Sequence, residues 1–284
     1  MVHLRPLPVP GGAAAVRVVP VLALLITTGC GSDVVTPPSD LPDASSSAPP
    51  GEASPVVPSD PDVLVGLRAD EPRQLGSTPA EVEVATLDGG RLEQGPGPDG
   101  AAGGAIDFPD FTTDPEYPRA VVRLQTVATG DVNPGSADLV WGATVKIDAV
   151  SKGNAVDNGD NIIQRGLSSD PVIFKAEVDG DRPACLLRGA AGELIVRADL
   201  VMDPSHWYTV QCRRSGDTLT VFTLDHDTDE TTARQVEGPV GALDFPDATV
   251  PVTIGGKLSH EGAIIASSTD QFNGLMSEPY VKIL

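Results

Sequence analysis

The chain has 284 residues, with 40 acidic against 19 basic side chains and a net charge of −21 at pH 7. It contains 30 Gly and 27 Pro, which excludes a helical bundle or coiled coil and favours short strands joined by turns. The charge argues against nucleic acid and against electrostatic binding to an anionic membrane, since both need patches of Lys and Arg. We therefore expect no nucleic-acid partner.

The N-terminal residues have the pattern of an export signal. Arg5 and Arg17 make this end of the chain positive, and Val18–Thr28 is an apolar run of eleven residues. The run is far shorter than the roughly 20 residues that a helix needs to cross a bilayer. It fits the core of a secretory signal.

Small residues precede a cysteine directly after this run, in the order Thr27-Thr28-Gly29-Cys30-Gly31. The arrangement resembles a bacterial lipobox, in which signal peptidase II cuts before the cysteine. The resemblance implies a signal peptide of residues 1–29, cleavage between Gly29 and Cys30, and a lipid on Cys30. Because two or three acyl chains hold a protein stably at a membrane, the mature chain would be anchored on the extracytoplasmic face. The alternative is an ordinary secreted protein that is cut nearby.

Residues 30–80 are expected to form a disordered tether. The stretch Gly31–Asp62 contains eight Pro, seven Ser and six acidic residues, with no Lys or Arg. Such a stretch cannot bury enough apolar surface to offset the entropy lost on ordering, and its like charges repel one another. Residues 63–80 are mixed in composition and are assigned to the tether as well. Its role would be to hold the body at a distance from the membrane.

Residues 81–284 are expected to form one all-β domain, because short apolar or alternating runs recur between turn signals. The expected strands are Glu81–Leu87, Ile106–Phe108, Ala120–Leu124, Leu139–Ile147, Val172–Val178, Ala184–Arg188, Leu194–Ala198, Trp207–Arg213, Thr218–Leu224, Val252–Ile254 and Tyr280–Ile283. Turn signals such as Asp179-Gly180 separate them, and Gly89–Gly104 is expected to be a loop. So many short strands without a helical stripe predict a two-sheet antiparallel sandwich.

The cysteines fit this interpretation. If Cys30 carries a lipid, Cys185 and Cys212 remain, and both lie on expected strands of an exported chain. We therefore expect a disulfide between them. The alternative is two buried free thiols.

Several stretches of the chain together resemble a known family. They are Asp160–Leu167, Arg182–Cys185, Trp207–Cys212, Val252–Gly256, Phe272–Gly274 and Tyr280–Ile283. Their order resembles the laminin G-like or concanavalin A-like jelly roll of secreted actinobacterial proteins, over roughly residues 81–284. The resemblance implies an antiparallel jelly-roll sandwich, and Cys185 and Cys212 match a cysteine pair common in that subgroup. It implies little about activity, because the fold hosts lectins, adhesion modules and glycosidases.

Glycosidases of this fold carry a row of carboxylates on one strand, and Glu177-Val-Asp179-Gly-Asp181 is the nearest match here. The acid/base Glu is replaced by a shorter Asp, and Asp179-Gly180 is a hairpin signal. We therefore expect a solvated turn at this place, no catalytic residue and no enzyme. A glycoside hydrolase, or a degenerate relative of one, remains the alternative.

Two turns rich in carboxylates are candidate calcium sites, since hard cations prefer oxygen ligands from loops. The first, Asp225-His-Asp227-Thr-Asp229-Glu230, lacks the Gly and Glu of an EF-hand loop and is more simply a polar hairpin tip. The second, Asp157-Asn-Gly-Asp160-Asn, is slightly favoured, so Asp157 and Asp160 are the candidate metal ligands. A solvated turn is the simpler interpretation at both, and no other cofactor is expected.

The histidines and tryptophans give no stronger signal. His206, His226 and His260 have no metal-ligand spacing. Trp141 and Trp207 are candidates for stacking on a sugar ring, but both lie in expected strands and are predicted to pack in the core.

We therefore expect a monomeric, lipid-anchored, extracytoplasmic and non-catalytic module. It would bind a glycan or protein partner through loops at one edge of the sandwich. A third interpretation is a structural component of the cell envelope without a discrete ligand.

Overall fold

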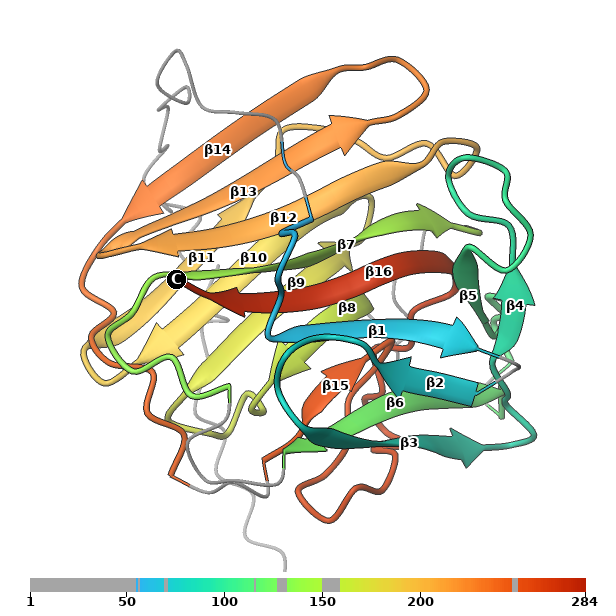
Figure 1. Ribbon diagram of the computed structural model, residues 1–284, viewed down its shortest axis with the longest axis horizontal. Coiled ribbons are helices and arrows are strands. Elements are labelled where there is room, and N and C mark those ends of the chain that lie inside the picture. Colours follow the sequence, from blue (N-terminus) through green and yellow to red (C-terminus); the bar gives the residue numbers. More distant parts are fainter. Residues whose placement is uncertain are drawn as a thin grey trace, which may run out of the picture. The chain divides into compact units, whose positions relative to one another are not determined.

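The computed structural model describes residues 55, 57–68, 71–114, 116–126, 132–149, 159–246 and 250–284. All of these residues lie within one compact unit, Ala44–Leu284. The regular elements of these residues are all β-strands, which form two antiparallel sheets packed face to face (Figure 1). The predicted all-β jelly-roll sandwich is thus confirmed. No helix able to span a membrane occurs in the described ranges.

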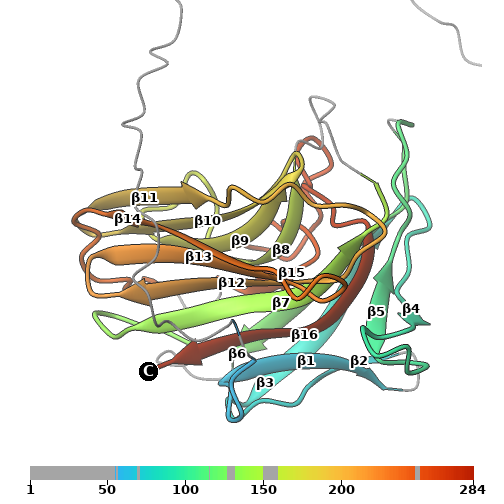
Figure 2. The same cartoon turned by 90° about the horizontal axis from the view of Figure 1, so that it is seen from above.

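The larger sheet has nine strands. Its main path runs through β14 (Thr231–Glu237), β13 (Thr218–Asp225), β12 (Tyr208–Ser215), β7 (Leu139–Ile147), β16 (Gly274–Ile283), β1 (Val63–Arg68) and β2 (Glu71–Gln74). Beside this path, β5 (Ala105–Phe108) pairs with β16, and β4 (Glu93–Gly95) pairs with β5. Figure 2 shows β4 and β5 standing at one end of the sheet.

The smaller sheet has seven strands and forms the second layer of the sandwich (Figure 2). Its order is β11 (Gly192–Arg197), β10 (Arg182–Gly189), β9 (Ile173–Asp179), β8 (Asp160–Arg165), β15 (Val252–Ile254), β6 (Arg119–Thr126) and β3 (Ala80–Leu87).

The apolar face predicted for β7 forms the centre of the core. Leu139, Trp141, Ala143, Val145 and Ile147 are all fully buried, as alternation along a strand requires. The Trp141 ring lies 5.7 Å from the ring of Phe174 on β9, so the two sheets are in direct contact here. The core position predicted for Trp141 is therefore confirmed.

The eleven expected strands are all present, and β7 and β15 have the predicted bounds. The loop expected over Gly89–Gly104 contains the short β4, and neither β8 nor β14 has a counterpart among the expected strands. The sequence of β14, TTARQVE, is mostly polar because the strand lies at a sheet edge and is only half-buried. Hydrophobic alternation therefore does not reveal it.

The ordered body begins before the predicted boundary at residue 81. Strands β1 and β2 lie within the range assigned to the tether, so that assignment is wrong for residues 63–68 and 71–74. Val63 and Val65 are buried in the core, and the two strands extend the larger sheet beyond β16. Asp62 secures the entry to β1, since its N–H donates to Val281 O at 2.9 Å and its carboxylate accepts from Ile283 N at 2.7 Å.

The predicted disulfide joins the two sheets. Cys185 lies on β10 and Cys212 on β12, with their Cα atoms 5.7 Å apart and a sequence separation of 27. Both residues are fully buried within the core. The bond therefore restricts the unfolded chain while crossing the centre of the folded sandwich.

We predict that replacing both cysteines (Cys185→Ala with Cys212→Ala) lowers the free energy of unfolding by about 3 kcal/mol, the loop-closure value for a loop of this length. Urea unfolding of the oxidised protein and of the double variant measures the difference. Reduced wild-type protein should resemble the double variant. Equal urea midpoints for the oxidised and reduced wild type would contradict the prediction.

Candidate functional site

A cleft with a volume of about 650 Å³ lies around β4, β5 and the segment that follows β5. We call it the β5 cleft. Its lining is Gly89, Gly90, Arg91, Glu93, Asp107, Phe108, Pro109, Asp110, Phe111, Thr112, Asp114, Glu116, Tyr117 and Pro118. A volume in the range of 300–1,000 Å³ is usual for sites that bind small molecules.

The back of the cleft is anchored to the two residues that come directly before β16. Phe108 on β5 packs edge-to-face against Phe272, with the ring centroids 5.5 Å apart. Next to it, Asn273 Nδ2 donates a hydrogen bond to Pro109 O at 2.5 Å. These two contacts hold the start of the segment after β5 against the sandwich.

One side of the cleft requires glycine. Gly90 follows β3 in a turn that is closed by a hydrogen bond from its N–H to Leu87 O at 3.0 Å. A Cβ atom on Gly90 would lie 2.0 Å from Arg119 O, so a larger residue would force the two segments apart. Arg119 itself is buried, donates to the Asp88 carboxylate at 2.6 Å, and lies over the Tyr117 ring at 3.9 Å.

The charge of the cleft is strongly negative. Its lining contains Glu93, Asp107, Asp110, Asp114 and Glu116 against the single cation Arg91, which forms an ion pair with Glu93.

Burial and these like charges affect the pKa of Asp107. Desolvation raises the pKa of its carboxyl above the ordinary value, and Asp110, Glu93 and Asp148 raise it further. Asp148, whose carboxylate accepts a hydrogen bond from Phe111 N at 2.6 Å, also has a raised pKa, mainly through desolvation. The site therefore has an excess of negative charge that a positively charged ligand group would relieve.

An aromatic ring lies among these carboxylates. Phe111 is half-buried, and its backbone is held by the bond to Asp148. A ring face beside several hydrogen-bond acceptors offers both stacking and polar contacts to a hydroxyl-rich ligand. The lining therefore offers the groups that a binding site for such a ligand needs.

The structure places the candidate metal ligands as follows. Asp157 lies outside the described residues, as do Gly29 and Cys30 of the predicted lipidation site. Asp160 is the first residue of β8 and is fully buried, so the solvated turn expected there is wrong for this residue. Calcium binding by Asp157 and Asp160 stays a prediction.

The predicted hairpin at the carboxylate row is confirmed. Asp179 on β9 lies opposite Arg182 on β10, and Gly180 between them has a positive φ of 67°. Glu177 forms an ion pair with Lys175, whose ammonium group also lies 3.3 Å from Asp270. Asp179 forms an ion pair with Arg197, so both carboxylates of this row, Glu177 and Asp179, are paired with cations.

Trp207 is largely buried, as predicted, but it lies just before β12 rather than within it. Its backbone N–H donates to the Asp227 carboxylate at 2.9 Å. The ring is therefore unavailable as an open sugar platform.

The sequence reasoning missed the β5 cleft. The stretch Asp107-Phe-Pro-Asp-Phe-Thr-Thr-Asp-Pro-Glu-Tyr117 alternates acidic and aromatic residues between two strands. This pattern was available as a signal, since carboxylates and rings in one loop often line a ligand site.

Three solved structures illustrate what this chain is similar to. The binding domain of Paraclostridial Mosquitocidal Protein 1 matches with a TM-score of 0.53 and 9% identity, covering 79% of this chain and 49% of that one. A mutant of HCR D/C VPI 5995 matches with a TM-score of 0.50 and 12% identity, covering 78% of this chain and 49% of the other. The LG1-3 region of the laminin alpha2 chain matches with a TM-score of 0.42 and 19% identity, over 54% of this chain and 29% of its own length.

These likenesses concern the fold alone. The chain spans about half or less of each of these structures. No protein-family model and no curated protein matches the sequence.

We predict that Asp107→Asn stabilises the protein at neutral pH. Because the folded-state pKa of Asp107 is raised, its contribution to stability is complete below the ordinary value of 3.8 and is lost as the pH rises through the raised value. The variant, which has no charge to bury, should therefore be more stable than the wild type at neutral pH and no more stable at about pH 3.5. Urea unfolding at both pH values measures this.

The control for this prediction is Asp217→Asn, in an exposed turn between β12 and β13. It should leave the urea midpoint nearly unchanged at either pH. A destabilised Asp107→Asn protein at neutral pH would contradict the prediction.

Proposed function

We propose that this protein is a non-catalytic binding module that is lipid-anchored on the extracytoplasmic face of the membrane and recognises a glycan through the β5 cleft. The single observation that supports this most is the cleft itself, in which Phe111 lies among several carboxylates at one end of the sandwich. The export signal, Cys30 and the acidic stretch that follows support the location.

The chemistry of the cleft limits the ligand. Carboxylates accept hydrogen bonds from sugar hydroxyls and from ammonium groups, but they repel sulfate, carboxylate and phosphate groups. The ligand class that fits is a neutral glycan or one that carries amino sugars. A protein partner would have to present a Lys or Arg side chain to the same carboxylates.

One observation favours a second candidate, a glycoside hydrolase. Glu93 on β4 and Asp107 on β5 lie directly opposite each other in an antiparallel pair. Opposite side chains in such a pair have Cβ atoms about 5 Å apart, and retaining glycosidases hold two carboxyl groups at about that separation. The ion pair between Arg91 and Glu93 opposes this role, because it neutralises one member of the pair.

We predict that Phe111→Ala weakens glycan binding by roughly tenfold, equivalent to about 1.4 kcal/mol for a lost stacking contact. An array that contains neutral, amino-sugar and sulfated or sialylated glycans first identifies the ligand. Titration calorimetry with the strongest neutral or amino-sugar ligand then compares the variant with the wild type. Asp110→Asn should also weaken binding of an amino-sugar ligand, because it removes a negative charge from the cleft.

The matched control is Ile195→Ala, which shortens an exposed apolar side chain on β11, outside the cleft. It should leave binding unchanged. Binding confined to sulfated or sialylated glycans would contradict the proposal. Release of reducing ends by the wild type but not by Asp107→Asn would favour the hydrolase. No binding to any glycan would favour a protein partner or a structural role.

We predict that intact mass spectrometry of the membrane fraction finds a mature chain that begins at Cys30 and carries two or three acyl chains. Cys30→Ser should move the protein from the membrane fraction to a soluble form. A wild-type chain with an intact leader and an unmodified Cys30 thiol would contradict the anchor but leave the binding proposal open.

A further inference from the structure

Three side chains with metal-binding atoms meet at the ends of β12 and β13. One ligand atom each from His206, Asp225 and Asp227 lies within 4.8 Å of the others. We call these residues the His206 cluster. These ligand atoms are close enough to surround a single ion, since nitrogen and carboxylate oxygen ligands each lie near 2.1 Å from a bound metal.

Strand pairing assembles this cluster from two turns. Tyr208 lies opposite Asp225 in the antiparallel pair of β12 and β13. The turn before β12 therefore faces the turn after β13. His226 N also donates to Trp207 O at 2.9 Å and ties the two turns together. The sequence showed no metal-ligand spacing because the histidine and the carboxylates come from different turns.

The carboxylates are oriented before any ion binds. Asp225 Oδ1 accepts hydrogen bonds from Asp227 N at 2.9 Å and Thr228 N at 3.2 Å, and its other oxygen faces His206 Nδ1 at 2.9 Å. Asp227 Oδ2 accepts from Trp207 N at 2.9 Å. Outer hydrogen bonds of this kind hold metal ligands in place in proteins.

The cluster is buried on one side and open on the other. The Asp225 side chain is 7% exposed and that of His206 is 28% exposed, while Asp227 is exposed. Asp203 adds further negative charge nearby. Its carboxylate accepts hydrogen bonds from the backbone N–H and the hydroxyl of Ser205. An ion held here would have protein ligands on one side and room for water, or for a group from a partner, on the other.

We propose that the His206 cluster binds a divalent transition-metal ion of the Zn²⁺ class. One imidazole nitrogen with two carboxylate oxygens is a set that suits Zn²⁺, whereas Ca²⁺ and Mg²⁺ prefer oxygen ligands alone. His206 Nδ1 would bind the ion in its deprotonated form, and any proton that it shares with Asp225 would pass to solvent. The site is separate from the β5 cleft and does not depend on the proposed function.

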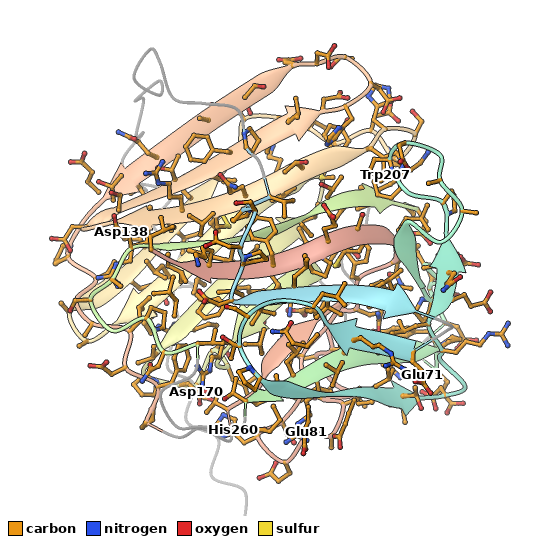
Figure 3. The ribbon with its side chains drawn as sticks, in the orientation of Figure 1. Glu71, Glu81, Asp138, Asp170, Trp207 and His260 are labelled. Carbon is orange, nitrogen blue, oxygen red and sulfur yellow. A yellow bond between two sulfur atoms is a disulfide. The ribbon has the colours of Figure 1, made fainter. Side chains whose placement is uncertain are left out.

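A second histidine–carboxylate pair serves as an internal control. His260 Nε2 lies 2.9 Å from Asp170 Oδ2, the same separation as in the His206–Asp225 pair. Among the described residues, no third His, Cys, Asp or Glu side chain completes a metal-binding group with this pair. In Figure 3 Asp170 and His260 lie near each other and far from Trp207, which is next to His206 in sequence.

The test uses the full-length chain without an affinity tag, with free thiols alkylated and excess Mg²⁺ present to occupy weak carboxylate sites. Equilibrium dialysis and titration calorimetry with Zn²⁺ should detect one site in the wild type. His206→Gln and Asp227→Asn should each weaken Zn²⁺ binding at least tenfold, and His260→Gln should leave it unchanged. Titration with Co²⁺ should give visible d–d absorption bands that are lost in His206→Gln.

Two results would overturn the proposal. One is equal Zn²⁺ binding by the wild type, His206→Gln and Asp227→Asn. The other is tighter binding of Ca²⁺ than of Zn²⁺. Circular dichroism spectra of the variants that match the wild type would show that the losses do not come from unfolding. Asp227 is exposed, so its variant is suited to this comparison.

Discussion

The alternating apolar face of β7 is the constraint on which the rest of the structure depends. A shift of one residue in this strand would move Trp141 and its neighbours from the core to the opposite face of the sheet. With β7 held in one register, its partners β12 and β16 are held as well, because both pair with it along most of its length. The disulfide at Cys212 then ties β12 to the smaller sheet.

This register also decides which ends of the strands come together. Tyr208 of β12 lies opposite Val145, and Gly274 of β16 lies opposite both Ile147 and Phe108. The β5 cleft and the His206 cluster are therefore at the same end of the larger sheet, with β7 and β16 between them. Three strand spacings separate β12 from β5, which is about 15 Å. A large ligand could contact both sites at once.

Much of the fold was predictable from the sequence, because burial on one face imposes a period of two that the residues of β7 and β15 display. The half-buried edge strand β14 and the polar β2 lack this signal, whereas β1 has it in Val63 and Val65 but follows an acidic stretch with which it was grouped. The disulfide followed from counting cysteines. Of the His206 cluster, Asp225 and Asp227 lie in a turn that the sequence marks as a candidate cation site, but His206 joins them only after β12 and β13 pair, so the histidine could not be predicted. The acidic and aromatic pattern after β5 was visible but had no spacing that identifies a chemistry.

The bonds between Asp62 and β16 have a mechanical consequence. Strand β1 runs from these bonds toward the end that holds the β5 cleft, and β16, which also carries β5, runs the opposite way. A load applied between residues 57–62 and a ligand in the cleft would therefore act along the strands. The hydrogen bonds between β1 and β16 lie across this direction, so they would be sheared together rather than opened one after another. Such a geometry resists a force along the strands better than a force that pulls the two strands apart sideways.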